Sequence, residues 1–314
     1  MNTSVILWSA VAAFPLLTML TVTPLLTMAA VLLSAPRHTL RIAFAGASLN
    51  VLLSVYLLWV FDADTPGIHL AEHFDALGFV YRVGVDGTNI LFIPLTAVLG
   101  WLTLVYTLIT RHLEDRLFIA SLLAYQGILI GAFVALNAMQ FWFFCLAELV
   151  PLVLLTLDAG TGRRRNQALA YTLKTWLFGL GMSLIGFLLL GHGLWQSGLG
   201  LSFDWLILQQ HSVALPNESL IFILLLFGFA IRMPLFPFHA WLPLLAEQGT
   251  AASAAIYLTG LKLGIYAVMR FILPLTPAAA EQWAPFVVSL GLISIFYGAV
   301  LALMQINICR LMAF

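Results

Sequence analysis

The chain has 314 residues, of which 62% are hydrophobic and 8% are charged, and its mean hydropathy is +1.05. A soluble core of ordinary size cannot absorb this proportion of apolar residues. The formal net charge is zero and gives no indication of nucleic acid binding. The composition therefore predicts an all-α fold, a polytopic transmembrane helix bundle.

We predict nine spans from runs of about 20 apolar residues, the length of helix that crosses a bilayer. No basic region precedes the first apolar run, which argues against a cleaved signal peptide. Residues 1–13 either form an extra helix or extend the first span, and a tenth span begins at the C-terminus. The nine spans cover residues 14–35, 39–61, 88–110, 117–137, 139–157, 168–194, 218–245, 250–274 and 282–305.

The basic loops all lie on one side of this predicted membrane, and the opposite loops are mainly acidic. Since basic loops face the cytoplasm, we expect the N-terminus to lie outside. The expected location is a bacterial-type inner (plasma) membrane. The arginines that follow spans one, three, five and nine are Arg37, Arg41, Arg111, Arg116, Arg163, Arg164, Arg165 and Arg310.

Three charged residues lie deep inside predicted spans: Glu148 in span five, Arg232 in span seven and Lys262 in span eight. With a rise of about 1.5 Å per residue, they lie ~14, ~21 and ~18 Å from the face where each span begins. All three therefore lie at a similar depth in an apolar membrane core about 30 Å thick. Because a charge at that depth costs at least ~2.5–3.5 kcal/mol, these residues indicate a functional site.

The chemistry of the side chains separates their expected roles. Lys262 is the candidate proton carrier, because a desolvated lysine releases its proton readily, whereas Arg232 keeps its proton and is a fixed charge. The imidazole of His239 suits proton handling, although a histidine in a kinked helix is as often a structural hydrogen-bonding element. Lys174 either joins this ion pathway or extends to the cytoplasmic surface. The alternative to a relay is a structural ion pair between Glu148 and one cation.

Two prolines follow Arg232 closely and predict a break in span seven. Pro234 and Pro237 each remove a backbone hydrogen bond from a helix that contained them. Broken helices beside a charge are typical of ion pathways in membrane proteins.

Metal and cofactor motifs are missing from the sequence. Cys145 and Cys309 are isolated from each other, so we expect neither a disulfide framework nor a metal site. His69 and His73 have the four-residue spacing of helical metal ligands, but no third ligand accompanies them. We therefore expect no cofactor, no metal and no catalytic residues in this chain, with any redox or hydration chemistry in partner subunits.

Several segments together resemble the antiporter-like subunits of respiratory complex I, most closely the chain M type, which belongs to the Mrp antiporter superfamily. The resemblance covers roughly residues 80–314. Its main motifs are FAIRMPLFPFHAWLP, TAASAAIYLTGLKLGIYAVMRFILPL and GLISIFYGAVLALMQINICRLMAF, with RVGVDGTNILFIPLTAVLG at 82–100 and RRRNQALAYTLKTW at 163–176 upstream.

The resemblance implies a buried glutamate on the fifth helix, a lysine on the broken seventh, and a lysine on the eighth that passes protons along a hydrated axis. Lys262 matches the eighth-helix lysine, and Arg232 occupies the place of the seventh-helix lysine. Aligning on Pro151 puts the glutamate position at Leu146, two residues before Glu148, so the acid faces differently unless the helix is rewound. The family's DAHxxAPT after WLP reads LLAEQGT here.

Family members also carry a later inverted repeat with a second broken helix, which this sequence does not reach. It is either a fragment or a half-unit that needs a partner to complete its path. We expect N-terminal helices over 1–110, an antiporter-like repeat over 111–274, and the incomplete start of a second repeat over 275–314.

The main functional hypothesis is a subunit that translocates protons, or another cation such as Na⁺, in a hetero-oligomeric energy-coupling complex. One alternative is a divergent cation-coupling subunit of an inorganic-carbon uptake complex, partnered with a carbonic-anhydrase-like subunit. The other is a membrane scaffold that docks a catalytic partner and conducts nothing.

Overall fold

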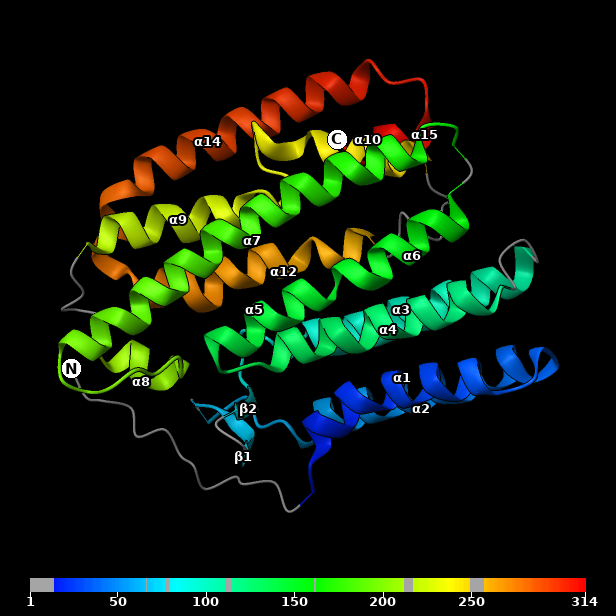
Figure 1. Ribbon diagram of the computed structural model, residues 1–314, viewed down its shortest axis with the longest axis horizontal. Coiled ribbons are helices and arrows are strands. Elements are labelled where there is room, and N and C mark those ends of the chain that lie inside the picture. The colour runs from blue at the N-terminus through cyan, green and yellow to red at the C-terminus, as the bar shows by residue number, and fades with distance from the viewer. Residues whose placement is uncertain are drawn as a thin grey trace. The chain divides into compact units, whose positions relative to one another are not determined.

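The computed structural model describes residues 14–65, 67–76, 79–110, 115–160, 162–211, 217–248 and 257–314 (Figure 1). The chain forms two compact units, Met1–Leu155 and Thr156–Phe314. The predicted division into 1–110, 111–274 and 275–314 rests on internal repeats and stays a prediction.

The predicted spans are confirmed as apolar helices. Among the described residues, eight helical stretches are long and apolar enough to cross a membrane, and a shorter apolar helix covers Glu218–Ala230. Each of the nine predicted spans has one of these as its counterpart. The eight are Leu16–Leu33, Pro36–Val60, Phe92–Ile109, Arg116–Val134, Ala138–Asp158, Arg165–Gln196, Tyr257–Leu275 and Pro277–Leu303.

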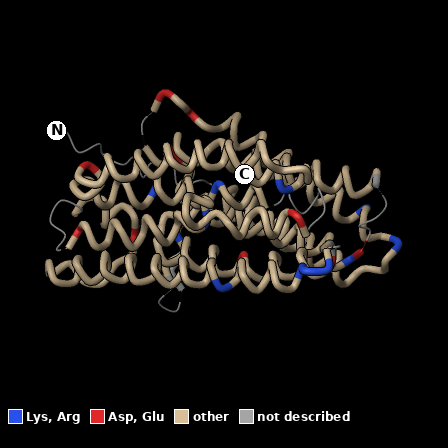
Figure 2. The backbone as a smooth tube through the Cα atoms, turned by 90° about the horizontal axis from the view of Figure 1, so that it is seen from above, with Lys and Arg blue, Asp and Glu red and all other residues tan. Residues whose placement is uncertain are grey.

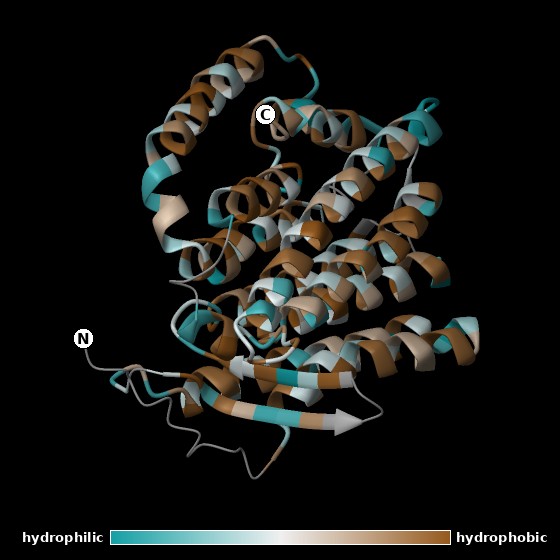
Figure 3. Ribbon diagram, turned by 60° about the vertical axis from the view of Figure 1, so that its left-hand side comes forward, coloured by the Kyte–Doolittle hydropathy of each residue, from teal (hydrophilic) through white to brown (hydrophobic). Residues whose placement is uncertain are grey.

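The first unit is a helix bundle that carries one small sheet. Its central helix is α4 (Arg116–Val134), of which 83% is buried, and α1 packs against both α4 and α2. Hydrophobic residues cover most of each helix in Figure 3, as expected for helices that face lipid on one side and neighbours on the other. The other helices are α1 (Leu16–Leu33), η2 (Pro36–His38), α2 (Thr39–Val60), α3 (Phe92–Thr110), α5 (Ala138–Ala147) and the first part of α6 (Leu149–Ala159).

The loop between α2 and α3 forms an antiparallel hairpin of β1 (His69–Ala76) and β2 (Phe79–Val85). The sequence analysis placed only a loop here, although FVYRVGV is rich in strand-forming residues. Glu72 joins the hairpin to the start of α1, where its carboxylate accepts hydrogen bonds from the Leu17 and Thr18 amides at 2.7 and 3.0 Å. The hairpin therefore caps the first transmembrane helix.

The second unit is organised around α7 (Arg165–Gln196), which packs against α9 and α10. Figure 2 shows that charged residues gather mainly at helix ends and loops, with few inside the helices. The other elements are α8 (Trp205–Gln210), α9 (Glu218–Ala230), η4 (Phe238–Ala240), α10 (Trp241–Gln248), α12 (Lys262–Ala267), the π-helix η5 (Val268–Ile272), α13 (Leu273–Leu275), α14 (Pro277–Leu303) and α15 (Ile308–Leu311).

Helices α7 and α9 approach closely because glycines face each other. A Cβ added to Gly228 would lie 2.9 Å from the Gly179 carbonyl oxygen and 2.9 Å from the Ser183 amide nitrogen. Small residues at such contacts let transmembrane backbones pack side by side. This packing fixes α9, and with it the start of the broken span.

Candidate functional site

Glu148 lies in the fifth apolar stretch, between α5, which ends at Ala147, and α6, which begins at Leu149. Its amide donates to the Phe144 carbonyl at 3.0 Å and its carbonyl accepts from the Leu152 amide at 3.2 Å, so the helical hydrogen bonds continue through the glutamate. Its side chain is fully buried and accepts a hydrogen bond of 2.5 Å from the hydroxyl of Tyr125 on α4. A charge-assisted hydrogen bond of this kind stabilises a carboxylate away from water.

The predicted break in span seven is confirmed, since α9 ends at Ala230, shortly before Pro234 and Pro237. Irregular backbone inside a membrane is tolerated only where its polar groups are satisfied within the protein. Here the indole nitrogen of Trp241 donates to the Ile231 carbonyl at 2.7 Å. The Phe236 amide donates to the hydroxyl of Ser294 on α14 at 3.0 Å.

Arg232 lies within this break and is 4% exposed. Its guanidinium carbon lies 4.6 Å from the centre of the Trp176 ring on α7. Trp176 in turn meets the ring of Trp241 edge-on, with the centroids 4.9 Å apart. The Trp176 ring therefore gives the buried guanidinium an aromatic contact, and Trp241 packs against the edge of that ring system.

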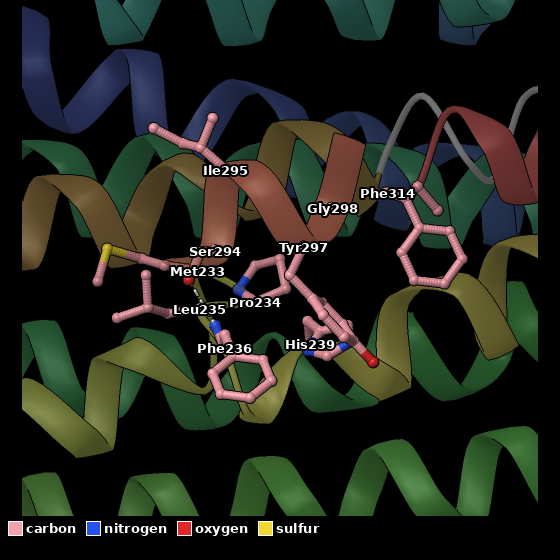
Figure 4. A pocket seen from close by; sticks show the side chains of 11 residues that line it. Met233, Pro234, Leu235, Phe236, His239, Ser294, Ile295, Tyr297, Gly298 and Phe314 are labelled. Carbon is pink, nitrogen blue, oxygen red and sulfur yellow. Dashed lines mark hydrogen bonds between the residues drawn. The ribbon is translucent and has the colours of Figure 1, made fainter. Parts of the chain in front are cut away.

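His239 follows in η4 and is half-buried in a cluster of rings (Figure 4). Its imidazole lies 5.1 Å from the ring centre of Tyr297 and 6.0 Å from that of Phe236. Among the described residues, no hydrogen-bond partner reaches its buried Nδ1. These rings line a pocket of about 280 Å³ beside the helix break, which Met233 and Phe314 also border.

Lys262 is the first residue of α12 and is half-buried. Its ammonium donates a hydrogen bond of 3.3 Å to the carbonyl of Leu258, one turn earlier. The side chain thus points back toward the start of the span, the usual direction for a long side chain in a helix. After Ala267 the helix widens into the π-helical turn Val268–Ile272, a feature frequent at functional sites.

Lys174 is exposed on α7, two residues before the buried Trp176, so it faces away from the Arg232 contact. This position suits an ammonium that extends to the membrane surface. Its membership of the ion pathway stays a prediction. The grouping of Glu148 with Arg232 and Lys262 joins residues of two separate units and stays a prediction as well.

Arg270 is a buried cation within predicted span eight that the sequence analysis did not single out. The side chain is 2% exposed, with its guanidinium carbon 4.0 Å from the centre of the Trp205 ring. The Trp205 indole donates to the Arg270 carbonyl at 2.6 Å. Five apolar or proline residues follow Arg270 before the span ends, which is the signal that places it inside the helix.

The histidine pair near the hairpin does not form a metal site. His69 and His73 lie on strand β1, where four residues span about 13 Å rather than one helical turn. Across the described ranges, no group of three or more His, Cys, Asp or Glu side chains is placed to hold a metal ion.

Apolar helices of membrane-spanning length, with buried ionisable residues inside them and one span broken, define the class. The chain is a polytopic helical membrane protein with charged side chains within its spans. The family model described as NADH:quinone oxidoreductase/Mrp antiporter, TM matches residues 135–314. The chain belongs to this family.

Curated relatives agree with this assignment. NADH-quinone oxidoreductase subunit M of Rhodobacter capsulatus is 31% identical over 292 residues, covering 90% of this chain and 56% of the relative. The subunit M of Rickettsia conorii is 29% identical over 286 residues, covering 89% and 56%. The F(420)H(2) dehydrogenase subunit M of Methanosarcina mazei is 30% identical over 279 residues, covering 86% and 56%. The chain thus spans about half the length of the curated relatives it matches.

Solved structures show the same fold. A chain of respiratory complex I from Thermus thermophilus with bound NADH matches with a TM-score of 0.83 and 29% identity, covering 95% of this chain and 61% of that chain. A chain of the Mrp complex from Dietzia sp. matches with a TM-score of 0.81 and 20% identity, covering 96% and 56%. The second match is a likeness of fold.

Proposed function

We propose that the chain forms part of a proton- or other cation-translocating pathway in a multi-subunit membrane complex. The observation that carries this proposal is the half-buried Lys262 ammonium, which lies inside an apolar span of the unit that also holds the broken helix. An ammonium in such a span alternates between charged and neutral forms at a lower energetic cost than a permanently charged group. Membership in the family, whose matched relatives are subunits of membrane complexes, supports the same function.

The other residues have supporting roles in this proposal. Arg232, held against Trp176, stays charged and sets the local potential for a proton on Lys262. Glu148, bonded to Tyr125, provides a buried acid in the first unit. His239 lies beside the pocket at the break and passes protons to or from it.

The orientation of the chain in the membrane and its partner subunits are also part of this proposal. In this proposal the arginine-rich ends after spans one, three, five and nine face the cytoplasm, and the N-terminus lies outside an inner (plasma) membrane, as the positive-inside rule suggests. Other membrane subunits complete the complex and supply the driving reaction, as the matched relatives are subunits of such assemblies.

Proton flux into liposomes tests the proposal directly. The complex that contains this chain, purified with its partner subunits, is reconstituted with a pH-sensitive dye inside the vesicles, and a potassium gradient with valinomycin supplies the membrane potential. We expect Lys262→Ala to abolish flux, and Lys262→Arg to abolish it equally because arginine keeps the charge but does not release a proton.

The control is Glu281→Gln, which removes an exposed charge of the same unit outside the proposed pathway. We expect it to retain at least half of the flux. If the complex carrying Lys262→Ala conducts like the unmodified complex, or if the unmodified complex conducts no protons, the translocation proposal is wrong. A scaffold without conduction then explains the permanent charge of Arg232.

A further inference from the structure

Two buried hydroxyl groups meet inside the second unit, outside the residues assigned above. The Thr156 hydroxyl oxygen lies 2.8 Å from the Tyr257 hydroxyl oxygen, and either atom serves as the donor. Both side chains are 2% exposed. The residues are 101 positions apart, so the contact joins the end of α6 to the start of the stretch that carries Lys262.

The pair lies close to the basic end of this unit. The Thr156 carbonyl accepts from the Gly160 amide at 3.2 Å, and the Gly160 carbonyl accepts from the Arg165 guanidinium at 2.7 Å. Arg163 and Arg164 are exposed in the same turn. Thr156 is therefore about one helical turn from an arginine-rich turn whose Arg163 and Arg164 side chains are exposed.

The side chain of Lys262 is directed toward the same turn of its helix. Its ammonium reaches back to the carbonyl of Leu258, which is the residue directly after Tyr257. Lys262 thus approaches the Tyr257 turn from within the span, while Thr156 meets the Tyr257 hydroxyl from the neighbouring helix.

We infer that Thr156 and Tyr257 form a hydroxyl relay that passes protons between Lys262 and the basic end of the unit. The inference rests on the proposed function. In each passage, the Tyr257 oxygen takes up one proton from the Lys262 side as its own hydroxyl proton moves to the Thr156 oxygen. The Thr156 hydroxyl proton then leaves toward the loop, so both groups begin and end neutral, and rotation of the two hydroxyls resets the pair.

A hydroxyl pair is suited to this role because each oxygen both donates and accepts. A purely structural interhelical hydrogen bond needs only one direction, because it serves to hold the two helices together. The two roles differ in what they change. Loss of a structural hydrogen bond lowers the stability of the protein. Loss of a relay lowers the proton flux even in correctly folded protein.

The test uses the same liposome assay, with flux normalised to correctly folded, reconstituted chain. We expect Tyr257→Phe and Thr156→Val each to lower flux about tenfold or more, in line with the contribution of a positioned proton-transfer group. The double variant should lose no more than either single one, because the two hydroxyls act as one link. Thr156→Ser keeps the hydroxyl and should conduct within about twofold of the unmodified chain.

Thr172→Val is the matched control, because Thr172 is a buried threonine of the same unit whose hydroxyl bonds only within its own helix. It should leave flux unchanged. If Thr156→Val and Tyr257→Phe lower the melting temperature but conduct normally, the relay is wrong. If flux is also lost in Lys262→Ala, the proposed function still holds and only the relay is wrong. Normal flux in Lys262→Ala contradicts both the proposed function and the relay.

Discussion

The guanidinium of Arg232 lies over the indole of Trp176, with its central carbon 4.6 Å from the ring centre. The cation in the broken span is thus packed against a different helix, α7, at a position where it is 4% exposed. A tryptophan face is the aromatic surface that attracts a cation most strongly. The contact explains how a permanently charged residue is accommodated in this part of the chain.

Replacing Trp176 tests this contact. Trp176→Leu removes the π face and should destabilise the protein by about 2 kcal/mol or more, because a desolvated cation–π contact of about 2 kcal/mol and buried ring area are both lost. Trp176→Phe keeps a weaker face and should cost less. Thermal unfolding in detergent measures both changes. Trp195→Leu, at an exposed tryptophan of the same helix, is the control, and an equal loss there would contradict the assignment.

The close contact between α7 and α9 predicts that alanine substitutions at two glycines have opposite effects on stability. Gly228→Ala places a methyl group 2.9 Å from backbone atoms of α7 and should cost about 1–3 kcal/mol, as overpacking does elsewhere. Gly181→Ala meets no atom within 4 Å and should stabilise the helix by up to about 1 kcal/mol. Melting temperatures of the two variants should therefore move in opposite directions. Equal shifts would show that the glycines do not set the helix spacing.

Glu72 should stabilise the start of α1 through the hairpin. Glu72→Gln keeps the size of the side chain but removes the charge that faces the Leu17 and Thr18 amides. We expect a loss of about 0.5–2 kcal/mol. Hydrogen exchange read by mass spectrometry should show faster exchange at these amides. Asp62→Asn, at an exposed loop acid, should leave exchange in α1 unchanged, and the cap is not supported if both variants behave alike.

Tyr81 on β2 gives a prediction for alkaline pH. Burial raises the pKa of Tyr81 above its ordinary value of 10.0, and the nearby Glu72 carboxylate raises it further, while a hydrogen bond with Thr18 lowers it. The unfolded chain therefore loses this proton at a lower pH than the folded chain does. Its contribution to the free energy of unfolding is complete below pH 10 and is lost as the pH rises through the folded-state pKa.

Tyr81→Phe should remove this part of the pH dependence. We expect the melting temperature of the unmodified protein to fall more steeply above about pH 10 than that of Tyr81→Phe. Below about pH 9 the difference between the two should be constant. Parallel curves through the alkaline range would contradict a raised pKa at this position.

Much of the architecture was predictable because it depends on local composition. Span positions follow from the length of apolar runs, and the break after Ala230 follows from the two prolines and the charge beside them. The strand-forming residues of β2 gave a local signal for the hairpin that was not used, but its contact with α1 was not predictable, because Glu72 and Leu17 are 55 positions apart. No local pattern reports such a contact.

The sequence by itself determined that the chain spans a membrane and which residues with charged side chains lie inside the apolar runs, and from it we predict that Lys262 rather than Arg232 carries protons. Side-chain chemistry and hydrophobic length are properties of single residues and short runs. Only the tertiary structure decided that Arg232 lies on Trp176, that Arg270 is buried on Trp205, and that Thr156 meets Tyr257. Each of these contacts joins two helices distant in the chain, and the packing of the helices selects which faces meet.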